Sequence, residues 1–114
     1  MAEVVVADDD RSVRDLVRLN LELEGHLVVG EAADGDTTLQ VMLVARPDVL
    51  VLDMMMPGGG GEDVLRRLIR SAGRPRVVAY SASPSHLVLA GELGADATVL
   101  KSGNMEDLLA AVVA

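Results

Sequence analysis

Several residue types are rare or missing in this chain. It contains no cysteine, which excludes disulfide bonds and thiolate metal sites. It contains no phenylalanine or tryptophan, and Tyr80 is its single aromatic residue. A buried core must therefore be built from valine, leucine, alanine and methionine. Lysine also occurs once, as Lys101, although arginine occurs nine times. No stretch reaches the roughly 18 apolar residues that a membrane span needs.

The composition predicts one packed domain. The chain has 114 residues, of which 50% are hydrophobic and 25% are charged, as in soluble globular domains. Its net charge of -8 disfavours binding of nucleic acid by this domain itself, which requires clusters of lysine and arginine. The first residues lack the basic region of a signal peptide. We therefore expect a single cytoplasmic domain over residues 1–114, without membrane association.

Short apolar runs alternate with segments of helical periodicity, five times each. The run Val49–Leu52 is apolar on both faces, which is typical of a central parallel strand. Alternating strands and helices predict an α/β fold, a doubly wound parallel sheet with helices on both faces. The expected strands are Val4–Val6, Leu27–Val29, Val49–Leu52, Arg76–Tyr80 and Thr98–Leu100, and the expected helices are Ser12–Glu24, Asp34–Ala45, Glu62–Ala72, Pro84–Leu93 and one capped by Asn104.

Polar residues stand where four of these strands end. Asp8 and Asp9 follow the first strand, Asp53 the third, Ser81 the fourth and Lys101 the fifth. Ligands of such sheets bind outside the carboxyl ends of the strands. If the first strand lies between the second and the third, three carboxylates, one hydroxyl and one ammonium meet at one edge.

Three carboxylates this close together need a positive partner. At an effective dielectric constant near 20, each pair at 4–5 Å repels by roughly 3–4 kcal/mol. Mg²⁺ is the natural partner, because it prefers carboxylates, water and phosphoryl oxygens. With Lys101 as a second positive charge, the pattern predicts a phosphoryl-transfer site in which a carboxylate attacks. The glycines after Asp53 would let the backbone approach a ligand closely.

Each of these residues also has a simpler interpretation. Asp8 to Asp10 would favour the dipole at the start of the first helix, and Asp10 is the best candidate for that role. Asp53 would fit a turn before proline and glycine, Ser81 an ordinary loop, and Lys101 the solvated surface. Only their joint occurrence at four strand ends favours a site. His26 and His86 are expected at the surface, away from it.

The sequence closely resembles the receiver domain of two-component response regulators over essentially its whole length. The segments that carry the resemblance are "VVVADDDRSVRDL", "PDVLVLDMMMPGGGGEDVLRRL" and "GADATVLKS". It implies a flavodoxin-like (βα)5 fold with strand order 2-1-3-4-5. It also implies a signalling domain rather than an enzyme, with phosphohistidine of a sensor histidine kinase or phosphotransfer protein as the phosphate donor. The face of the fourth helix, fifth strand and fifth helix would dock an output partner or a second copy.

The resemblance also implies a role for each residue of the site. Asp53 would be the phosphoacceptor, and Lys101 would contact the phosphoryl group. Ser81 would be the switch hydroxyl, assisted by the backbone N–H of Ala82. Magnesium would be held by the carboxylates of Asp9 and Asp53, by Asp8 through water and by the carbonyl of Met55.

The chain departs from the family pattern at five places. Thr98 stands where an aromatic switch residue is usual, and Ser102 replaces the proline whose peptide bond is usually cis. The run Gly58–Gly61 predicts an unusually mobile loop. Met55 and Ser83 stand where the family tunes hydrolysis of the aspartyl phosphate, and neither is a strong water-positioning group. We therefore expect a long-lived phosphoryl state.

Three alternatives stay open from the sequence. A phosphohydrolase with an aspartyl nucleophile would need a second acid two residues after Asp53, where Met55 stands. A pseudo-receiver of the same fold, never phosphorylated, is favoured only by Thr98 and the glycine run. A flavodoxin-like cofactor binder would need hydroxyls and glycines after the first strand, where three acids stand.

Overall fold

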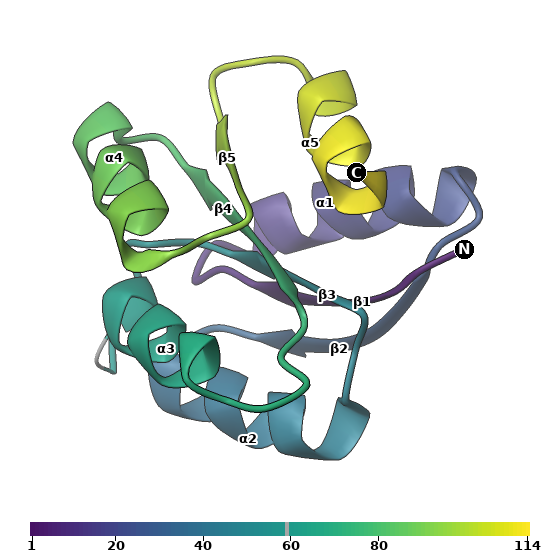
Figure 1. The fold of residues 1–114 in the computed structure, drawn as a ribbon. Helices are drawn as coiled ribbons and strands as arrows, with labels where there is room; N and C mark the ends of the chain where they lie inside the picture. Colours follow the sequence, from purple (N-terminus) through teal and green to yellow (C-terminus); the bar gives the residue numbers. More distant parts are fainter. Residues whose placement is uncertain (59) are drawn as a thin grey trace.

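The computed structural model describes residues 1–58 and 60–114 and contains a parallel sheet of five strands in the order β2-β1-β3-β4-β5. Helices alternate with the strands along the chain (Figure 1). The predicted α/β fold and strand order are confirmed. The elements are β1 Glu3–Ala7, α1 Arg11–Leu23, β2 Leu27–Ala32, α2 Gly35–Ala45, β3 Val49–Leu52, α3 Gly60–Ile69, β4 Arg76–Ser81, α4 Pro84–Leu93, β5 Ala97–Leu100 and α5 Met105–Val113.

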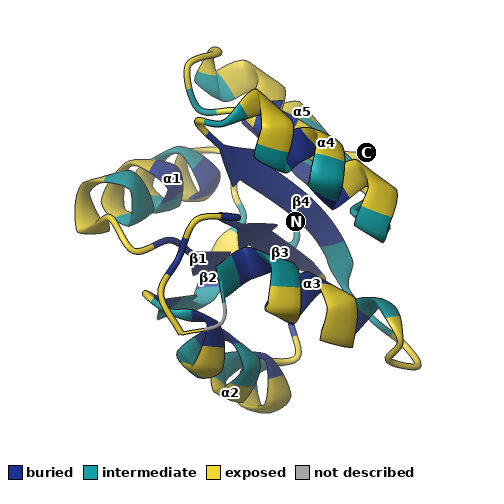
Figure 2. Ribbon diagram, turned by 90° about the vertical axis from the view of Figure 1, so that its left-hand side faces the viewer, coloured by how far each residue is buried: buried dark blue, intermediate teal, exposed yellow. Residues whose placement is uncertain are grey.

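Two apolar layers cover the two faces of the sheet, as the burial colours of Figure 2 show. Alternate residues of β1 divide between them, with Val4 and Val6 toward α1 and α5, and Val5 toward α2, α3 and α4. In β3, Leu50 packs in the layer with α2, α3 and α4, and Val51 packs in the layer with α1 and α5. Because both faces are buried, β3 carries an apolar residue at every position, and the interior of β1 and β4 is apolar almost throughout.

The termini of the elements follow local chemistry. Asp10 caps α1, because its side chain accepts a hydrogen bond from the Ser12 N–H at 2.9 Å. It therefore lies at the start of α1, where a favourable interaction with the helix dipole was predicted. Gly25, with φ of 84°, directly follows the C-cap of α1, where the left-handed conformation favours glycine. No peptide bond of the described residues is cis, consistent with Ser102 in place of proline.

Two elements, β2 and α3, differ from the predicted bounds by more than one residue at an end. β2 continues beyond the predicted Val29 to Ala32, although glycine and glutamate disfavour strands, because Val5, Val6 and Ala7 of β1 pair with these last residues. α3 begins at Gly60 and ends at Ile69, whereas residues 62–72 were predicted. Gly59, within the glycine run predicted to be mobile, lies outside the described residues.

No described helix combines the length and the apolar character that a membrane crossing requires.

Candidate functional site

The segment after β1 holds two acids in different environments. Asp8 is almost fully buried, and its Oδ1 accepts a hydrogen bond from the Asp10 N–H at 2.9 Å. Asp9 is exposed to solvent. The Asp8 N–H donates to the carbonyl of Ala32 at 3.0 Å, so β2 fixes where the acidic pair begins. This edge therefore offers one buried and one accessible carboxylate.

The third acid stands at the end of β3. The Asp53 N–H donates to the carbonyl of Ala7 at 2.9 Å, which continues the β1–β3 ladder by one residue. The Asp53 side chain is buried, and its Oδ1 accepts a hydrogen bond from the Met55 N–H at 3.0 Å. The backbone on both sides of Asp53 thus fixes the direction of its carboxylate.

The fold brings the three acids and the lysine together. Carboxylate oxygens of Asp8, Asp9 and Asp53 all lie within 4.8 Å of one another. Lys101 follows β5, and its Nζ lies 2.6 Å from Asp8 Oδ2 and 3.3 Å from Asp53 Oδ2. Three negative charges and one positive charge leave a local charge of −3 + 1 = −2. Hard oxygen donors with this charge suit a divalent cation such as Mg²⁺.

Burial and charge shift the protonation of this cluster. Burial raises the pKa of the Asp53 carboxyl; the Met55 N–H lowers it, the Asp8 charge raises it and Lys101 lowers it again, leaving a net rise. Burial acts against the charge on the Lys101 ammonium, but its hydrogen bond to Asp8 and the charges of Asp53 and Asp8 outweigh burial and raise the pKa of Lys101. Lys101 is therefore the built-in counter-ion of the two buried acids.

Ser81 and Ala82 lie at the end of β4, the strand next to β3. Ser81 is fully buried, and its Oγ accepts a hydrogen bond from the Ser83 N–H at 3.2 Å. Its carbonyl accepts the Lys101 N–H at 2.9 Å, which connects the hydroxyl-bearing strand to the lysine. Ala82 is exposed. The structure thus brings five of the predicted residues to one edge, with Ala82 directly beside Ser81.

The single aromatic side chain lies near the lysine of the site. Thr98 of β5 is exposed. Tyr80 is buried, and the centre of its ring lies 5.8 Å from Lys101 Nζ, a distance at which a cation is attracted to an aromatic face. The only aromatic residue of the chain therefore lies beside its only lysine.

Sequence reasoning missed an arginine that supports the acidic pair. Arg14 of α1 donates from Nη1 to the carbonyl of Asp8 at 2.8 Å and from Nε to Glu31 at 3.2 Å. Glu31 also pairs with Arg18. The position of Arg14, one turn into the helix after three acids, could have indicated this role from the sequence. Its partner Glu31 on β2 could not be identified without the fold.

Sequence reasoning also assigned the glycines a different purpose. A Cβ at Gly61 would lie 2.4 Å from the Asp53 carbonyl oxygen and 2.6 Å from the Met54 Cα. Glycine at this position therefore lets the start of α3 pack directly on the backbone of the candidate phosphoacceptor. The glycine allows a close approach between two backbone segments of the chain, whereas a close approach to a ligand was predicted from the sequence. His26 and His86 lie outside the site but are half-buried, contrary to expectation.

Comparisons with known proteins agree with this geometry. The family model for the response regulator receiver domain matches residues 4–113. A LuxR-family two-component response regulator from Aurantimonas is 29% identical, with a TM-score of 0.91 over 99% of this chain and 83% of that chain.

Two further solved structures are similar. The receiver domain of the putative response regulator NarL from Mycobacterium tuberculosis is 37% identical, with a TM-score of 0.87 over 98% of this chain and 93% of that chain. The receiver domain of RcsB from Salmonella enterica serovar Typhimurium, solved in the presence of the phosphomimetic BeF3−, is 28% identical, with a TM-score of 0.89 over 99% of this chain and 86% of that chain. The chain belongs to the family of two-component response regulator receiver domains.

Proposed function

We propose that this receiver domain accepts a phosphoryl group on Asp53 and that Mg²⁺ is required. The observation that carries the proposal is the cluster itself: Asp53 is buried beside Asp8 and Asp9, with the Lys101 ammonium 3.3 Å from its Oδ2. Burying a carboxylate next to two others and a lysine lowers the stability of the fold, so a purely structural role would not favour it. This arrangement is well suited to a reaction that brings a dianionic group to that place.

In the proposed step, a carboxylate oxygen of Asp53 forms a bond to phosphorus of the donor phosphohistidine. The phosphorus–nitrogen bond breaks, and its electron pair stays on the imidazole, which then takes up a proton. The products are an aspartyl phosphate and a neutral histidine. The hydrogen bond from the Met55 N–H to Asp53 Oδ1 holds the attacking group in place, so little orientational freedom is lost in the reaction.

Asp9 and Asp53 would hold the metal directly, Asp8 through water, and the carbonyl of Met55 would complete the protein ligands. When bound, Mg²⁺ supplies positive charge that stabilises the phosphoryl oxygens. Lys101 supplies the second positive charge. To contact the phosphoryl group it must give up part of its present ion pair with Asp8, whose oxygen lies 2.6 Å from Nζ.

The switch would begin at Ser81. Its buried hydroxyl and the N–H of Ala82 would donate hydrogen bonds to the phosphoryl oxygens, which moves the chain after β4. With Thr98 on β5, no aromatic side chain of that strand follows this movement. The Tyr80 ring, 5.8 Å from Lys101 Nζ, would instead respond to the displacement of the lysine.

Two exposed apolar surfaces suit the partners implied by this function. α1 starts directly after the acidic residues and exposes Leu16, Leu19 and Leu23, which supports docking of a sensor histidine kinase or phosphotransfer protein next to Asp53. On the other side, Val88 of α4 and Leu100 of β5 are exposed. They support a homodimer or an output contact through α4, β5 and α5, while the kinase face stays free.

The test is incubation with Mg²⁺ and acetyl phosphate, followed by intact mass measurement. We expect one phosphate adduct, its loss in Asp53→Asn, and its loss when EDTA removes the metal. Asp36→Asn, an exposed acid of α2, is the matched control and should be labelled normally. The absence of any adduct in the unaltered protein would instead favour a pseudo-receiver. Turnover of a phosphate ester would favour a hydrolase.

A further inference from the structure

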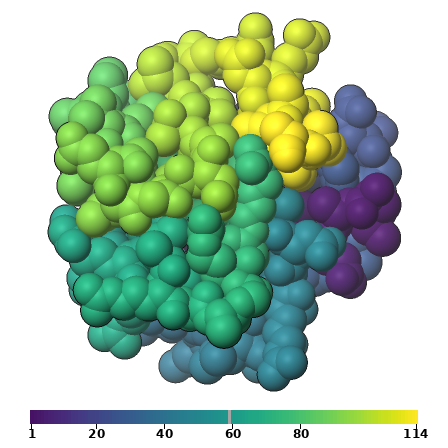
Figure 3. Space-filling model, viewed as in Figure 1, coloured from purple at the N-terminus to yellow at the C-terminus, as the bar shows by residue number. Residues whose placement is uncertain are grey.

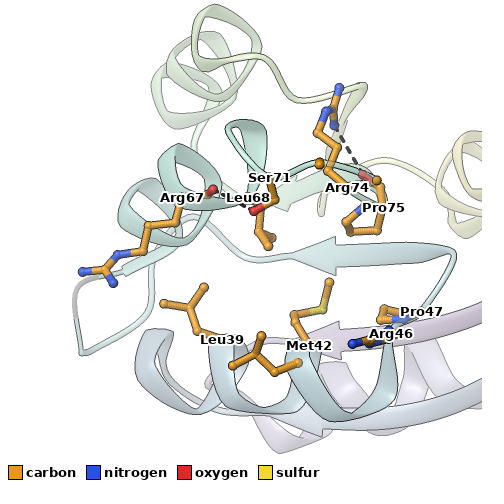
Figure 4. Close-up of a pocket in the computed structure, with 12 residues that line it drawn as sticks. Leu39, Met42, Arg46, Pro47, Arg67, Leu68, Ser71, Arg74 and Pro75 are labelled. Atoms are coloured by element: carbon orange, nitrogen blue, oxygen red, sulfur yellow. Dashed lines mark hydrogen bonds between the residues drawn. The ribbon is translucent and has the colours of Figure 1, made fainter.

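A groove between α2 and α3 lies at the opposite end of the sheet from the acidic cluster. Its cavity has a volume of about 710 Å³ and is lined by residues of both helices and by the turns before β3 and β4. In Figure 4, Leu39 and Met42 of α2 face Leu68 of α3 across it. The volume is in the range of built ligand sites, which are mostly apolar with a few polar groups. We call this cavity the α2–α3 groove.

On one side of the groove, α2 carries more apolar residues than the core buries. α2 buries Met42, but Leu43 and Val44 are 77% and 88% exposed. Leu43 lines the groove, whereas Val44 lines a separate hollow beside β2. A helix that is apolar on both its inner and its outer face is typical of a helix covered by a partner. On the surface in Figure 3, α2 and α3 adjoin along one side of the molecule.

Arginines stand at both ends of the groove. Figure 4 places Arg67 at one end, and Arg46 and Arg74 at the other. Arg74 donates two hydrogen bonds to Asp96, at 2.8 and 3.0 Å, which neutralises it. Arg46 and Arg67 are exposed and form no ion pair with any described residue. Two arginines without an ion-pair partner among the described residues therefore flank an apolar floor.

Nearby negative charge screens the two arginines unequally. The carboxyl ends of α2 and α3 each contribute about −0.5 charge near the groove. Asp48 lies near Arg46 in sequence and keeps its charge, but its Oδ2 accepts the Glu3 N–H at 2.8 Å and it forms no ion pair with Arg46. Arg67 also borders a smaller cavity lined by Asp36 and Asp63, so Arg46 is the less screened of the two.

We infer that the α2–α3 groove docks an acidic amphipathic helix of a partner protein, with aliphatic side chains on the groove floor and carboxylates at Arg46 and Arg67. The arrangement is that of helix-in-groove recognition, in which apolar anchors supply affinity and rim charges supply orientation. The groove is separate from the Asp53 site, so the inference is independent of phosphorylation and is tested on the unphosphorylated protein.

The probe is a fluorescein-labelled helical peptide with leucine on one face and glutamate on the other, titrated with the protein at low salt. We expect saturable binding that weakens as salt is added. A peptide with lysine in place of glutamate should not bind. Amide chemical shifts of Leu39, Met42 and Leu43 should change in the complex. Shifts confined to α1 or to α4 would overturn the inference.

Charge reversal provides the matched control. Arg46→Glu with Arg67→Glu should lower the affinity at least about tenfold. Arg11→Glu with Arg66→Glu changes the net charge equally on two exposed arginines outside the groove and should lower it far less. Equal losses in both pairs would overturn the inference, since only the total charge would then matter.

The apolar floor has its own control, and a second copy of the chain is a defined alternative. Leu43→Asp should abolish binding, whereas Val88→Asp, at an exposed aliphatic residue of α4, should not. Sedimentation measures whether the unaltered protein associates with itself through the groove, and we expect that it does not. If the unaltered protein self-associates and Leu43→Asp removes this association, the groove is occupied by another copy of the chain and the inferred acidic partner is wrong.

Discussion

The Nζ of Lys101 lies 2.6 Å from Oδ2 of Asp8, although β1 and β5 are separated by two strands in the sheet. The same ammonium also reaches Asp53, so one lysine compensates two buried acids. Replacing it by methionine leaves both carboxylates without their partner. We expect Lys101→Met to lower the free energy of unfolding by about 1–3 kcal/mol without metal, and Mg²⁺ to restore part of that loss, as followed by urea denaturation.

The control for this prediction is a double-mutant cycle. In an Asp8→Asn background one of the two charges is already removed, so Lys101→Met should cost less. An equal cost in both backgrounds would contradict the ion pair as the source of the effect.

Arg14 is expected to act on the metal site without touching the metal. Its Nη1 holds the carbonyl of Asp8 at 2.8 Å, and Glu31 holds its Nε. Arg14→Met should weaken Mg²⁺ binding several-fold, because the acidic segment loses its anchor. Calorimetric titration with Mg²⁺ measures the change. Arg11→Met, at an exposed arginine of the same helix, should leave the affinity unchanged.

Gly61 and Gly91 should respond oppositely to the same substitution. Gly61→Ala forces a Cβ to within 2.4 Å of the Asp53 carbonyl oxygen, so we expect a loss of roughly 1–3 kcal/mol in stability and slower labelling by acetyl phosphate. Gly91 of α4 has nothing within 4 Å of such a Cβ. Gly91→Ala should stabilise the protein by about 0.5–1 kcal/mol. Thermal unfolding of both variants compares them directly.

The stability of the β4–β5 region should depend on acid pH through Asp96. The hydrogen bonds from Arg74 hold the pKa of Asp96 below its usual value of 3.8, against the opposing effect of burial, and the Val77 N–H lowers it further. A lowered folded pKa means that the stabilisation is complete above 3.8 and is lost as the pH falls toward the folded value.

Asp96→Asn should therefore cost roughly 1 kcal/mol at about pH 7 and progressively less below about pH 4, as followed by urea denaturation. Asp15→Asn, at the exposed end of a 3.9 Å ion pair with Arg11, should cost little at either pH. If the loss of stability in Asp96→Asn stays the same at acid pH, the hydrogen-bond geometry of Asp96, and not its charge, is the source of the stabilisation.

The phosphorylated form should be long-lived. The Met55 side chain is half-exposed and apolar, and the Ser83 hydroxyl is engaged with Ser85 at 3.0 Å and with the N–H of His86. Neither side chain is placed to orient an attacking water. Decay of the adduct, followed by intact mass, should take far longer than seconds, and Met55→Asn, which adds an amide beside Asp53, should shorten it. Decay of the adduct within seconds in the unaltered protein would contradict the predicted long lifetime.

Much of the fold followed from patterns within single segments. The unbroken apolar run Val49–Leu52 predicted a strand buried on both faces, and it is. Asp10 and Gly25 marked the limits of α1 because capping depends on neighbouring backbone groups only. The end of β2 was missed, since Gly30 and Glu31 are strand residues only through their pairing with Val5 and Val6 of β1.

The order of residues along the chain is enough to show which residue types end each strand, and so which acids and which lysine are available for a site. The apolar character of α2 and the excess of acidic charge can be read from it in the same way. Folding is needed to show that Lys101 pairs with Asp8 as well as Asp53, that Arg14 reaches the Asp8 carbonyl, and that Gly61 packs on the Asp53 backbone. These are contacts between different secondary-structure elements or their connecting loops. Their geometry depends on how strands stack and helices pack, which no local periodicity encodes.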